Sequence, residues 1–204
     1  KVADAVARIK AGEAAKIVLA RDIWATSSTL LDTRALVTRF SAAYPTTWAF
    51  AVDGLVGATP EMLVRRERRL VASRVLAGTI RRTGDDERDL AHAAALARSS
   101  KDLEEHEFAV ESLARALAPF VESANVPEVP SVLHLPNVMH LATDVTAVLQ
   151  RDADGGRPSS LRLAAALHPT AAVGGTPTAQ AVALVREIEG MERGRYAGPV
   201  GWIG

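Results

Sequence analysis

The sequence predicts a mixed α+β domain, on three observations. Short apolar runs are bounded by Gly, Pro or Asp, as is typical of strands, and two of them flank an Asp53-Gly54 turn that predicts a hairpin. Longer stretches repeat apolar residues at helical spacing, most clearly at 99–117. Of the 204 residues, 48% are apolar, which is enough for one large core or two small ones.

Composition excludes several classes of partner. The 24 basic and 24 acidic residues cancel, so the net charge favours neither a nucleic acid nor an acidic membrane. The chain has no cysteine, which excludes disulfides and thiolate metal sites. It contains no run of eighteen apolar residues and nothing at its start that resembles a signal peptide. We therefore expect a soluble, cytoplasmic protein with no nucleic-acid and no membrane partner.

Helix caps and turn residues set the elements of the first half. Gly12 ends an opening helix, and Asp32 or Thr33 caps a second helix that Tyr44-Pro45 ends. Apolar runs between these points predict strands. The expected elements are a helix at 2–11, strands at 16–20 and 23–26, a helix at 33–44, the hairpin at 48–58, a charged turn at 65–69, and strands at 70–73 and 75–80.

The second half begins with a polar linker at 81–89, followed by one helix that runs to about Leu117. Three prolines then predict an extended connection at 125–136. The remaining expected elements are strands at 138–143 and 145–149, a glycine-containing loop at 152–158, a helix at 161–167, a small-residue loop at 170–177, a helix at 179–188, and a strand-like ending at 200–203.

The predicted helix around 99–110 has three different faces. Its apolar stripe contains His106 and should face a core. A second stripe, which water can solvate, consists of Glu104, Glu107 and Glu111. Asp102 and Glu105 lie one turn apart among small residues on the third face. Such paired carboxylates are either salt-bridged structure or ligands for a hard cation such as Mg²⁺, and the helix alone favours the first.

Two ionisable residues occupy unusual places beside apolar strands. Lys16 heads one strand, where it is either a solvated strand end or a desolvated lysine whose pKa, normally about 10.4, is lowered enough for a base. Glu61 follows Pro60 at a junction of two strands. It is either a surface turn residue or a carboxyl in a cleft, where desolvation would raise its pKa as a general acid requires. The solvated place is the commoner one for both.

Seven segments, in order and across essentially the whole chain, resemble the chorismate-utilising enzymes, the family of isochorismate, salicylate, anthranilate and aminodeoxychorismate synthases. The segments are KIVLAR at 16–21, ATPEML at 58–63, LAGT at 76–79, SKDLEEH at 100–106, HLAT at 140–143, HPTAAVGGTP at 168–177 and YAGPVGW at 196–202. The resemblance implies large antiparallel sheets packed face to face, with outer helices and an active site between the sheets.

The resemblance also implies roles for individual residues. Lys16 would be the general base on a water that attacks C2 of chorismate, and Glu61 the general acid that protonates the departing C4 hydroxyl. Family members that use ammonia typically lack this lysine, so Lys16 favours water. Gly78 and Thr79 would line the site of the substrate carboxylate, and His140 and Tyr196 would flank the ring. Glu105 would bind Mg²⁺ directly, with Asp102 beside it as a supporting residue or as a ligand through a water.

Ala172 and Val173 bear on the product. Isochorismate synthases tend to have alanine and an aliphatic residue there, whereas Thr79 also occurs in salicylate synthases and does not separate the two. The resemblance therefore implies a Mg²⁺-dependent isochorismate synthase, an isomerase that acts on chorismate as a monomer. A salicylate synthase, which would go on to eliminate pyruvate, and a non-catalytic domain remain open. So does the onward use of isochorismate, in menaquinone, a siderophore or another product.

Family members continue past the Gly201-Trp202 region into further strands and a last helix. Those strands carry an arginine for a substrate carboxylate, and the helix carries a second metal glutamate. The 204 residues contain neither. We therefore expect a partial chorismate-binding domain over 1–204, half a metal site, and no activity from this chain alone.

Overall fold

A computed structural model describes residues 1–152 and 155–204; the expected loop at 152–158 includes Ala153 and Asp154, which lie outside the described residues. The helices are α1 (Val2–Lys10), α2 (Thr33–Ala43), α3 (Asp86–Leu96), α4 (Ser100–Leu117), α5 (Ser160–Leu167) and α6 (Thr178–Glu189), with a 3₁₀ turn at Ala118–Phe120. The strands are β1 (Lys16–Ile17), β2 (Trp48–Val52), β3 (Leu55–Thr59), β4 (Met62–Glu67), β5 (Leu70–Arg81), β6 (Val121–Asn125), β7 (Ser131–His134), β8 (Val138–Leu149) and β9 (Gly175–Thr176).

Two long strands organise the main sheet. β5 and β8 pair antiparallel from Leu70 opposite Val148 to Arg81 opposite Val138. β4 lies on the outer side of β5, and both β6 and β7 pair with β8. The hairpin β2–β3 and the short pair β1–β9 form separate two-stranded antiparallel sheets. The expected α+β class with antiparallel sheets is confirmed.

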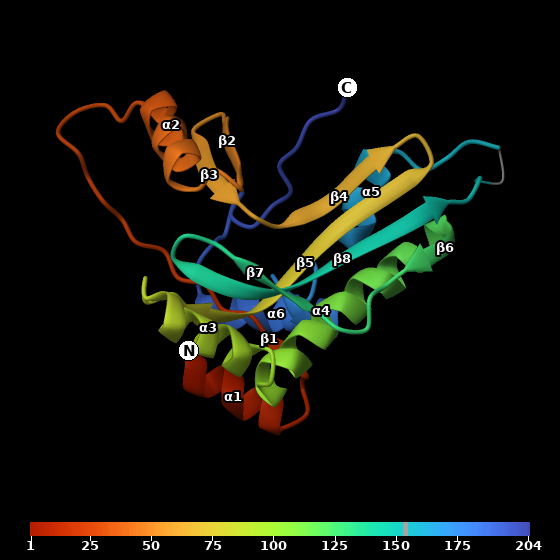
Figure 1. Cartoon of the computed structure of the whole chain (residues 1–204), viewed down its shortest axis with the longest axis horizontal. Coiled ribbons are helices and arrows are strands. Elements are labelled where there is room, and N and C mark those ends of the chain that lie inside the picture. The colour runs from red at the N-terminus through yellow and green to blue at the C-terminus, as the bar shows by residue number, and fades with distance from the viewer. Residues whose placement is uncertain (153–154) are drawn as a thin grey trace.

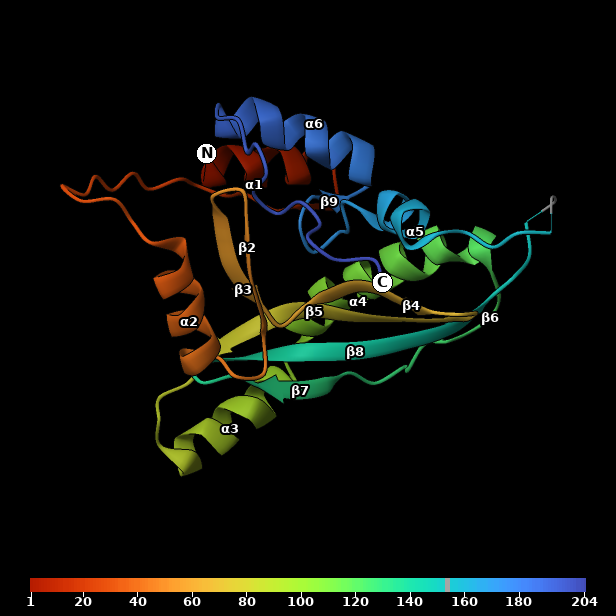
Figure 2. The same cartoon turned by 90° about the horizontal axis from the view of Figure 1, so that it is seen from above.

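The core lies between this sheet and the helices on one of its faces. In β8 every second residue from Met139 to Leu149 is buried, which is the alternation of a strand with one face on a core. The buried face packs against α4 and α5, and α3 and α4 lie on the same side of β5 and β8 (Figure 1). A second, smaller cluster joins α1 and α6, which lie side by side (Figure 2).

His106 connects α4 to the two central strands. Its side chain is 3% exposed, as expected from its place in the apolar stripe. Nδ1 lies 3.2 Å from the carbonyl of Ala77, so it carries the proton and donates, and Nε2 then accepts from the Thr143 hydroxyl at 2.7 Å. Burial lowers the His106 pKa, which keeps the ring neutral in this arrangement.

The single helix expected up to Leu117 is wrong, because the structure has α3 and α4 with a break at Ala97–Ser99. Each helix has its own N-cap. The Asp85 side chain accepts from the Arg88 N–H, and the Ser99 side chain accepts from the Asp102 N–H. An N-cap serine satisfies donors that only a helix start leaves free, so Ser99 marks a beginning and Leu96 belongs to the preceding helix.

Several expected strands differ from those observed. Strand 16–20 contracts to Lys16–Ile17, and 23–26 and 200–203 form no strand among the described residues. Trp24 and Trp202 are 91% and 81% exposed, and a strand needs a neighbour to hold its backbone groups. The two strands expected at 70–73 and 75–80 form one continuous strand, and so do those expected at 138–143 and 145–149. The connection at 125–136 contains β7, and most of the charged turn at 65–69 lies in β4.

A membrane-spanning helix is not found among the described residues, because none of their helices is both long and apolar enough.

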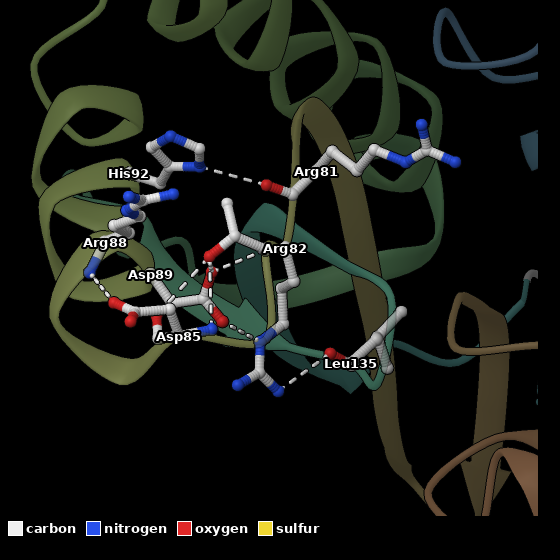
Figure 3. Close-up of polar contacts among 8 residues, drawn as sticks. Arg81, Arg82, Asp85, Arg88, Asp89, His92 and Leu135 are labelled. Atoms are coloured by element: carbon white, nitrogen blue, oxygen red, sulfur yellow. Dashed lines mark hydrogen bonds and ion pairs between the residues drawn. The ribbon is translucent and has the colours of Figure 1, made fainter.

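Asp89 anchors α3 to the end of β5 (Figure 3). Its carboxylate is almost fully buried and accepts from the Thr83 N–H at 2.7 Å, from the Thr83 hydroxyl at 2.9 Å and from Arg82 Nε at 2.7 Å. The Arg82 guanidinium also reaches the Leu135 carbonyl at 3.4 Å. The bonds from Thr83, with Arg82, hold the Asp89 pKa well below its ordinary value.

We expect Asp89→Asn to lower the melting temperature at pH 7 by at least about 5 °C, because the amide cannot accept all three bonds. A depressed pKa stabilises the fold above the unfolded value of 3.8 and loses this effect as pH falls below it. The gap between the two proteins should therefore narrow below about pH 4. Thermal melts from pH 3 to 7, with the exposed Asp86→Asn as control, measure it; a gap that stays constant would contradict the role of the charge.

Candidate active site

Lys16 lies on β1 with its side chain turned toward α4. The side chain is 11% exposed, and Nζ lies 3.3 Å from Glu105 Oε1. The buried Nζ has no hydrogen bond of normal geometry within the described part of the chain. Burial lowers the Lys16 pKa, and the charges of Glu105 and Glu61 act in the opposite direction. Of the two arrangements that the sequence left open, the structure has the desolvated lysine.

Glu61 lies between β3 and β4, in a junction that the sheet holds in place. The register of β4 against β5 shifts between Met62 and Arg65, and the buried Ser73 hydroxyl contacts the carbonyls of Met62 and Leu63 at 3.1 and 2.8 Å. Burial raises the Glu61 pKa to about 7, against smaller lowering effects of the Leu76 N–H and the Lys16 charge. The carboxyl therefore lies in a desolvated environment within the electrostatic influence of Lys16.

Gly78 allows β5 to approach the first turn of α4. It lies at a register shift between Ala77 and Thr79 and has φ +76°. A Cβ at this position would lie 3.1 Å from the Asp102 Cβ and 3.3 Å from the Asp102 carbonyl oxygen, so glycine is required on both conformational and steric grounds. The Asp102 carboxylate accepts from the Ser99 hydroxyl, and Glu105, one turn further, is 40% exposed.

Thr79 and His140 face each other across β5 and β8. The Thr79 hydroxyl and His140 Nδ1 are 2.9 Å apart. Burial lowers the His140 pKa, so this ring is neutral near pH 7. His140 lies between the buried Met139 and Leu141, so its side chain points to the other face of the sheet. The register shift before Thr79 turns the Thr79 side chain to that same face.

The small-residue loop at 170–177 is tied directly to the strand that carries Lys16. Lys16 pairs with Thr176 and Ile17 with Gly175. A Cβ on Gly175 would lie 2.1 Å from the Lys16 carbonyl oxygen, so only glycine permits this pairing. Opposite residues of an antiparallel pair point to the same face, so the side chains of Lys16 and Thr176 lie on one side of this ladder. Among the described residues, the Thr176 hydroxyl and Lys16 Nζ are both buried without a hydrogen-bond partner.

The structure thus brings some of the expected residues together and leaves others apart. Lys16 contacts Glu105, and Asp102 contacts Gly78. The loop of Ala172 and Val173 joins the Lys16 strand through β9. Tyr196 is 61% exposed, in a turn closed by its N–H to the Arg193 carbonyl. Within the described residues, no ion pair or hydrogen bond joins its side chain to another candidate.

Glu189 and Arg193 were not predicted from the sequence. Glu189 is 1% exposed and ends α6, and Arg193 pairs with it and donates to the carbonyls of Val18 and Val173. The available signal was their spacing of four residues after an apolar helical stretch, the spacing at which Glu and Arg form a pair. Nothing in that spacing indicates that the pair is buried.

Comparisons with known proteins identify the family of the chain. The family model described as chorismate binding enzyme matches residues 1–204. MenF of Mycobacterium tuberculosis, a proposed isochorismate synthase, is 40% identical over 92% of this chain and 52% of its own length. The salicylate biosynthesis isochorismate synthase of Pseudomonas aeruginosa is 39% identical over 100% of this chain and 42% of its own length. DhbC of Bacillus anthracis, a proposed 2,3-dihydroxybenzoate-specific isochorismate synthase, has a crystal structure with a TM-score of 0.86 and 38% identity, covering 94% of this chain and 52% of that one.

The chain spans about half the length of these relatives. Within that half the agreement extends over nearly all of its residues, in sequence and in fold. The match of the family model over the whole chain and the identity of nearly 40% to several relatives lead to one conclusion. The chain belongs to the family of chorismate binding enzymes.

Proposed function

We propose that the protein is an isochorismate synthase, an isomerase that converts chorismate to isochorismate with Mg²⁺. The observation that carries this proposal is the desolvated Lys16, its Nζ 3.3 Å from Glu105 and its charge coupled to Glu61, whose pKa is raised to about 7. The names of the relatives support the same activity.

Burial prepares both groups for opposite roles. Desolvation favours the neutral form of any ionisable group. For Lys16 the neutral form is a free amine, which can take a proton, and for Glu61 it is the carboxylic acid, which can give one. A single physical cause, burial, therefore shifts Lys16 toward its basic form and Glu61 toward its acidic form.

The proposed reaction needs such a pair. Lys16 Nζ takes a proton from water as its oxygen bonds to C2, and the double-bond electrons of the ring shift toward C4. The C4–O bond breaks, and Glu61 gives its proton to the leaving hydroxyl, which departs as water. One water enters and one leaves, so the product is an isomer of the substrate. The loop of Ala172 and Val173 and the pair Thr79–His140 are proposed to border the ring and its carboxylates, with Gly78 at the carboxylate and Tyr196 beside the ring.

The residues of α4 fit a Mg²⁺ ion with few protein ligands. Mg²⁺ prefers oxygen ligands and is often held by one or two carboxylates, the remaining positions going to water and substrate. The half-exposed Glu105 is proposed to bind the ion directly and Asp102 to assist beside it or through a water. The described residues contain no group of three or more His, Cys, Asp or Glu side chains that could hold a metal ion. Bound there, Mg²⁺ would hold a substrate carboxylate and offset its repulsion from Glu105.

Product analysis tests the proposal. The full-length protein, incubated with chorismate and Mg²⁺, is expected to form isochorismate, resolved from chorismate by chromatography, without release of pyruvate. Salicylate fluorescence together with pyruvate would identify a salicylate synthase instead. No conversion of chorismate at any Mg²⁺ concentration would indicate a domain that has kept the fold without the catalysis.

Glu105→Gln is expected to weaken the apparent affinity for Mg²⁺ by about tenfold or more, because the amide lacks the charge that a hard cation requires. Glu104→Gln is the matched control, since Glu104 is the preceding residue of α4 and points into water. Titration of Mg²⁺ by calorimetry, alone and with chorismate, measures the effect without turnover. Equal Mg²⁺ affinity in the two variants would remove Glu105 from the proposed metal site.

A further inference from the structure

One guanidinium joins three parts of the chain beside the candidate site. Arg193 Nε donates to Glu189 Oε2 at 2.8 Å. From the same side chain, Nη2 donates to the Val18 carbonyl at 2.8 Å and Nη1 to the Val173 carbonyl at 3.3 Å. The Glu189 carboxylate also accepts from the backbone N–H of Ala20. The end of α6, the segment after Lys16 and the loop of Val173 therefore meet at one ion pair.

Apart from the packing of Ile17 and Leu19 against α1 and α6, the segment that carries Lys16 is held by few backbone bonds. β1 is two residues long. Among the described residues, two further backbone bonds extend its ladder to β9, from the Ala15 N–H to the Thr176 carbonyl and from the Val18 N–H to the Gly174 carbonyl. Beyond Ala20 the chain is exposed up to α2. A two-residue pair gives weak positional control by itself. Contacts at its ends therefore add to the control of where the Lys16 backbone lies.

We infer that Arg193 and Glu189 are positioning residues that fix the Lys16 strand against the Val173 loop. The inference rests on the proposed function, in which Lys16 acts on a substrate bordered by that loop. The two carbonyls that Arg193 holds lie in these two segments, Val18 two residues after Lys16 and Val173 in the loop itself. A planar guanidinium can bind a carboxylate and two carbonyls at once, whereas an ammonium is a point charge without this fixed geometry.

If Arg193 had a purely structural role, it would act by holding α6 against the rest of the fold. Apolar contacts that do not involve Arg193 already hold α6 in place. Leu184 and Ile188 pack against Ala5 and Ala14, with Ile17 and Leu19 at the edge of the cluster. None of these contacts involves the Arg193 side chain. Loss of the ion pair should therefore loosen the two segments that Arg193 bridges and leave α6 and the main sheet in place.

The test compares Arg193→Ala, Arg193→Lys and Glu189→Gln in the full-length protein. Arg186→Ala is the control, because Arg186 lies on the exposed side of the same helix. Circular dichroism gives the folded fraction at the assay temperature. Amide hydrogen exchange is measured by mass spectrometry on peptides covering 14–20 and 170–176 and on peptides from β5 and β8. Initial rates with chorismate and Mg²⁺ give kcat and KM.

We expect kcat per folded molecule to fall by about 10- to 100-fold in Arg193→Ala, with a smaller change in KM, because a shift of the order of 1 Å in a reacting group has this effect. Arg193→Lys should recover part of the loss, since it keeps the charge and can donate hydrogen bonds, although without the fixed planar geometry of the guanidinium. Exchange should become faster at 14–20 and 170–176 alone. If Arg193→Ala does not fold, Arg193→Lys and Glu189→Gln provide the same comparison.

Unchanged kcat per folded molecule in Arg193→Ala would overturn the inference. So would faster exchange spread over β5 and β8, which is the signature of lost stability, or no change at 14–20 and 170–176. The exchange measurement needs no turnover. If the unmodified protein leaves chorismate unconverted, the proposed function fails, and the exchange result still decides whether the pair fixes these segments.

Discussion

Replacing Lys16 with alanine is expected to lower kcat by about 10²- to 10⁴-fold, the range observed for loss of a general base. The neutral amine of Lys16 is the group proposed to take the proton from water, and the other lysines, Lys1, Lys10 and Lys101, are all exposed. Lys16→Met should lose as much as Lys16→Ala, although it keeps most of the buried stem. Steady-state rates with chorismate and Mg²⁺, with Lys10→Ala as control, measure the effect.

The fold should survive this change. Lys16 Nζ is desolvated and has no normal hydrogen bond in the described residues. Its removal leaves Glu105, which is 40% exposed and can be hydrated, and Glu61, whose pKa is already raised by burial and which can stay protonated. We expect the melting temperature of Lys16→Met to stay within about 3 °C of the unmodified protein, corresponding to roughly 1 kcal/mol. A Lys16→Met protein that is folded and retains its kcat would defeat the assignment of Lys16 as the base.

Local patterns predicted several elements because the relevant physics is local. The Asp53-Gly54 turn specified the β2–β3 hairpin, and the structure has a strand on each side of it. Asp32 caps α2 through a bond to the Arg34 N–H, as its side chain and position indicated. Such features depend on three or four neighbouring residues. The sequence contains all of the information that they require.

Features that depend on distant residues could not be predicted from periodicity. The apolar spacing from Leu96 to Leu117 is continuous, although the helix breaks at Ser99, because both sides of the break face the same sheet and bury their leucines on it. Strand 16–20 shortened to two residues because its partner, β9, is itself two residues long. The length of a strand is set by the number of residues that pair with a neighbouring strand.

The same limit applied to the candidate site. Composition and spacing identified Lys16, Glu61, Asp102 and Glu105 as unusual, and left a solvated and a desolvated place open for the first two. Burial decides between these places, and burial is a property of the whole fold. Arg193 and Glu189 were missed for the same reason, since an i,i+4 pair on a helix is usually exposed and contributes little. Only the structure shows that the Glu189 carboxylate is buried and that Arg193 bridges the end of α6, the segment after β1 and the 170–177 loop.

Glu61→Gln is expected to lower kcat/KM by about 10²- to 10⁴-fold, because the amide cannot give a proton to the C4 hydroxyl. In the unmodified protein, kcat/KM should fall as pH rises through about 7, where Glu61 loses the proton that it must donate. The glutamine variant should lack this limb in its residual activity. Glu107→Gln, on the exposed face of α4, is the control and should keep the profile of the unmodified protein.

Glu61→Gln lowers activity but should raise the stability of the fold at higher pH. This second effect distinguishes a buried acid from a surface turn residue. The Glu61 pKa is raised from 4.5 to about 7 in the folded protein. The folded state therefore holds a proton that the unfolded chain has already lost between these values, and the unmodified protein loses stability as pH rises from about 4.5 to 7, by at most about 3 kcal/mol. Glu61→Gln has no such loss.

The two proteins should therefore have similar stability at pH 4.5, and the variant should be more stable by about 1 to 2 kcal/mol at pH 8, an estimate that allows for partial exposure of the carboxyl. Urea unfolding at the two pH values measures this difference. A variant that is inactive and more stable only at the higher pH is the result expected of a carboxyl held in a desolvated site for catalysis. If the variant gains nothing at pH 8, the Glu61 carboxyl is hydrated and its assignment as the acid loses its physical basis.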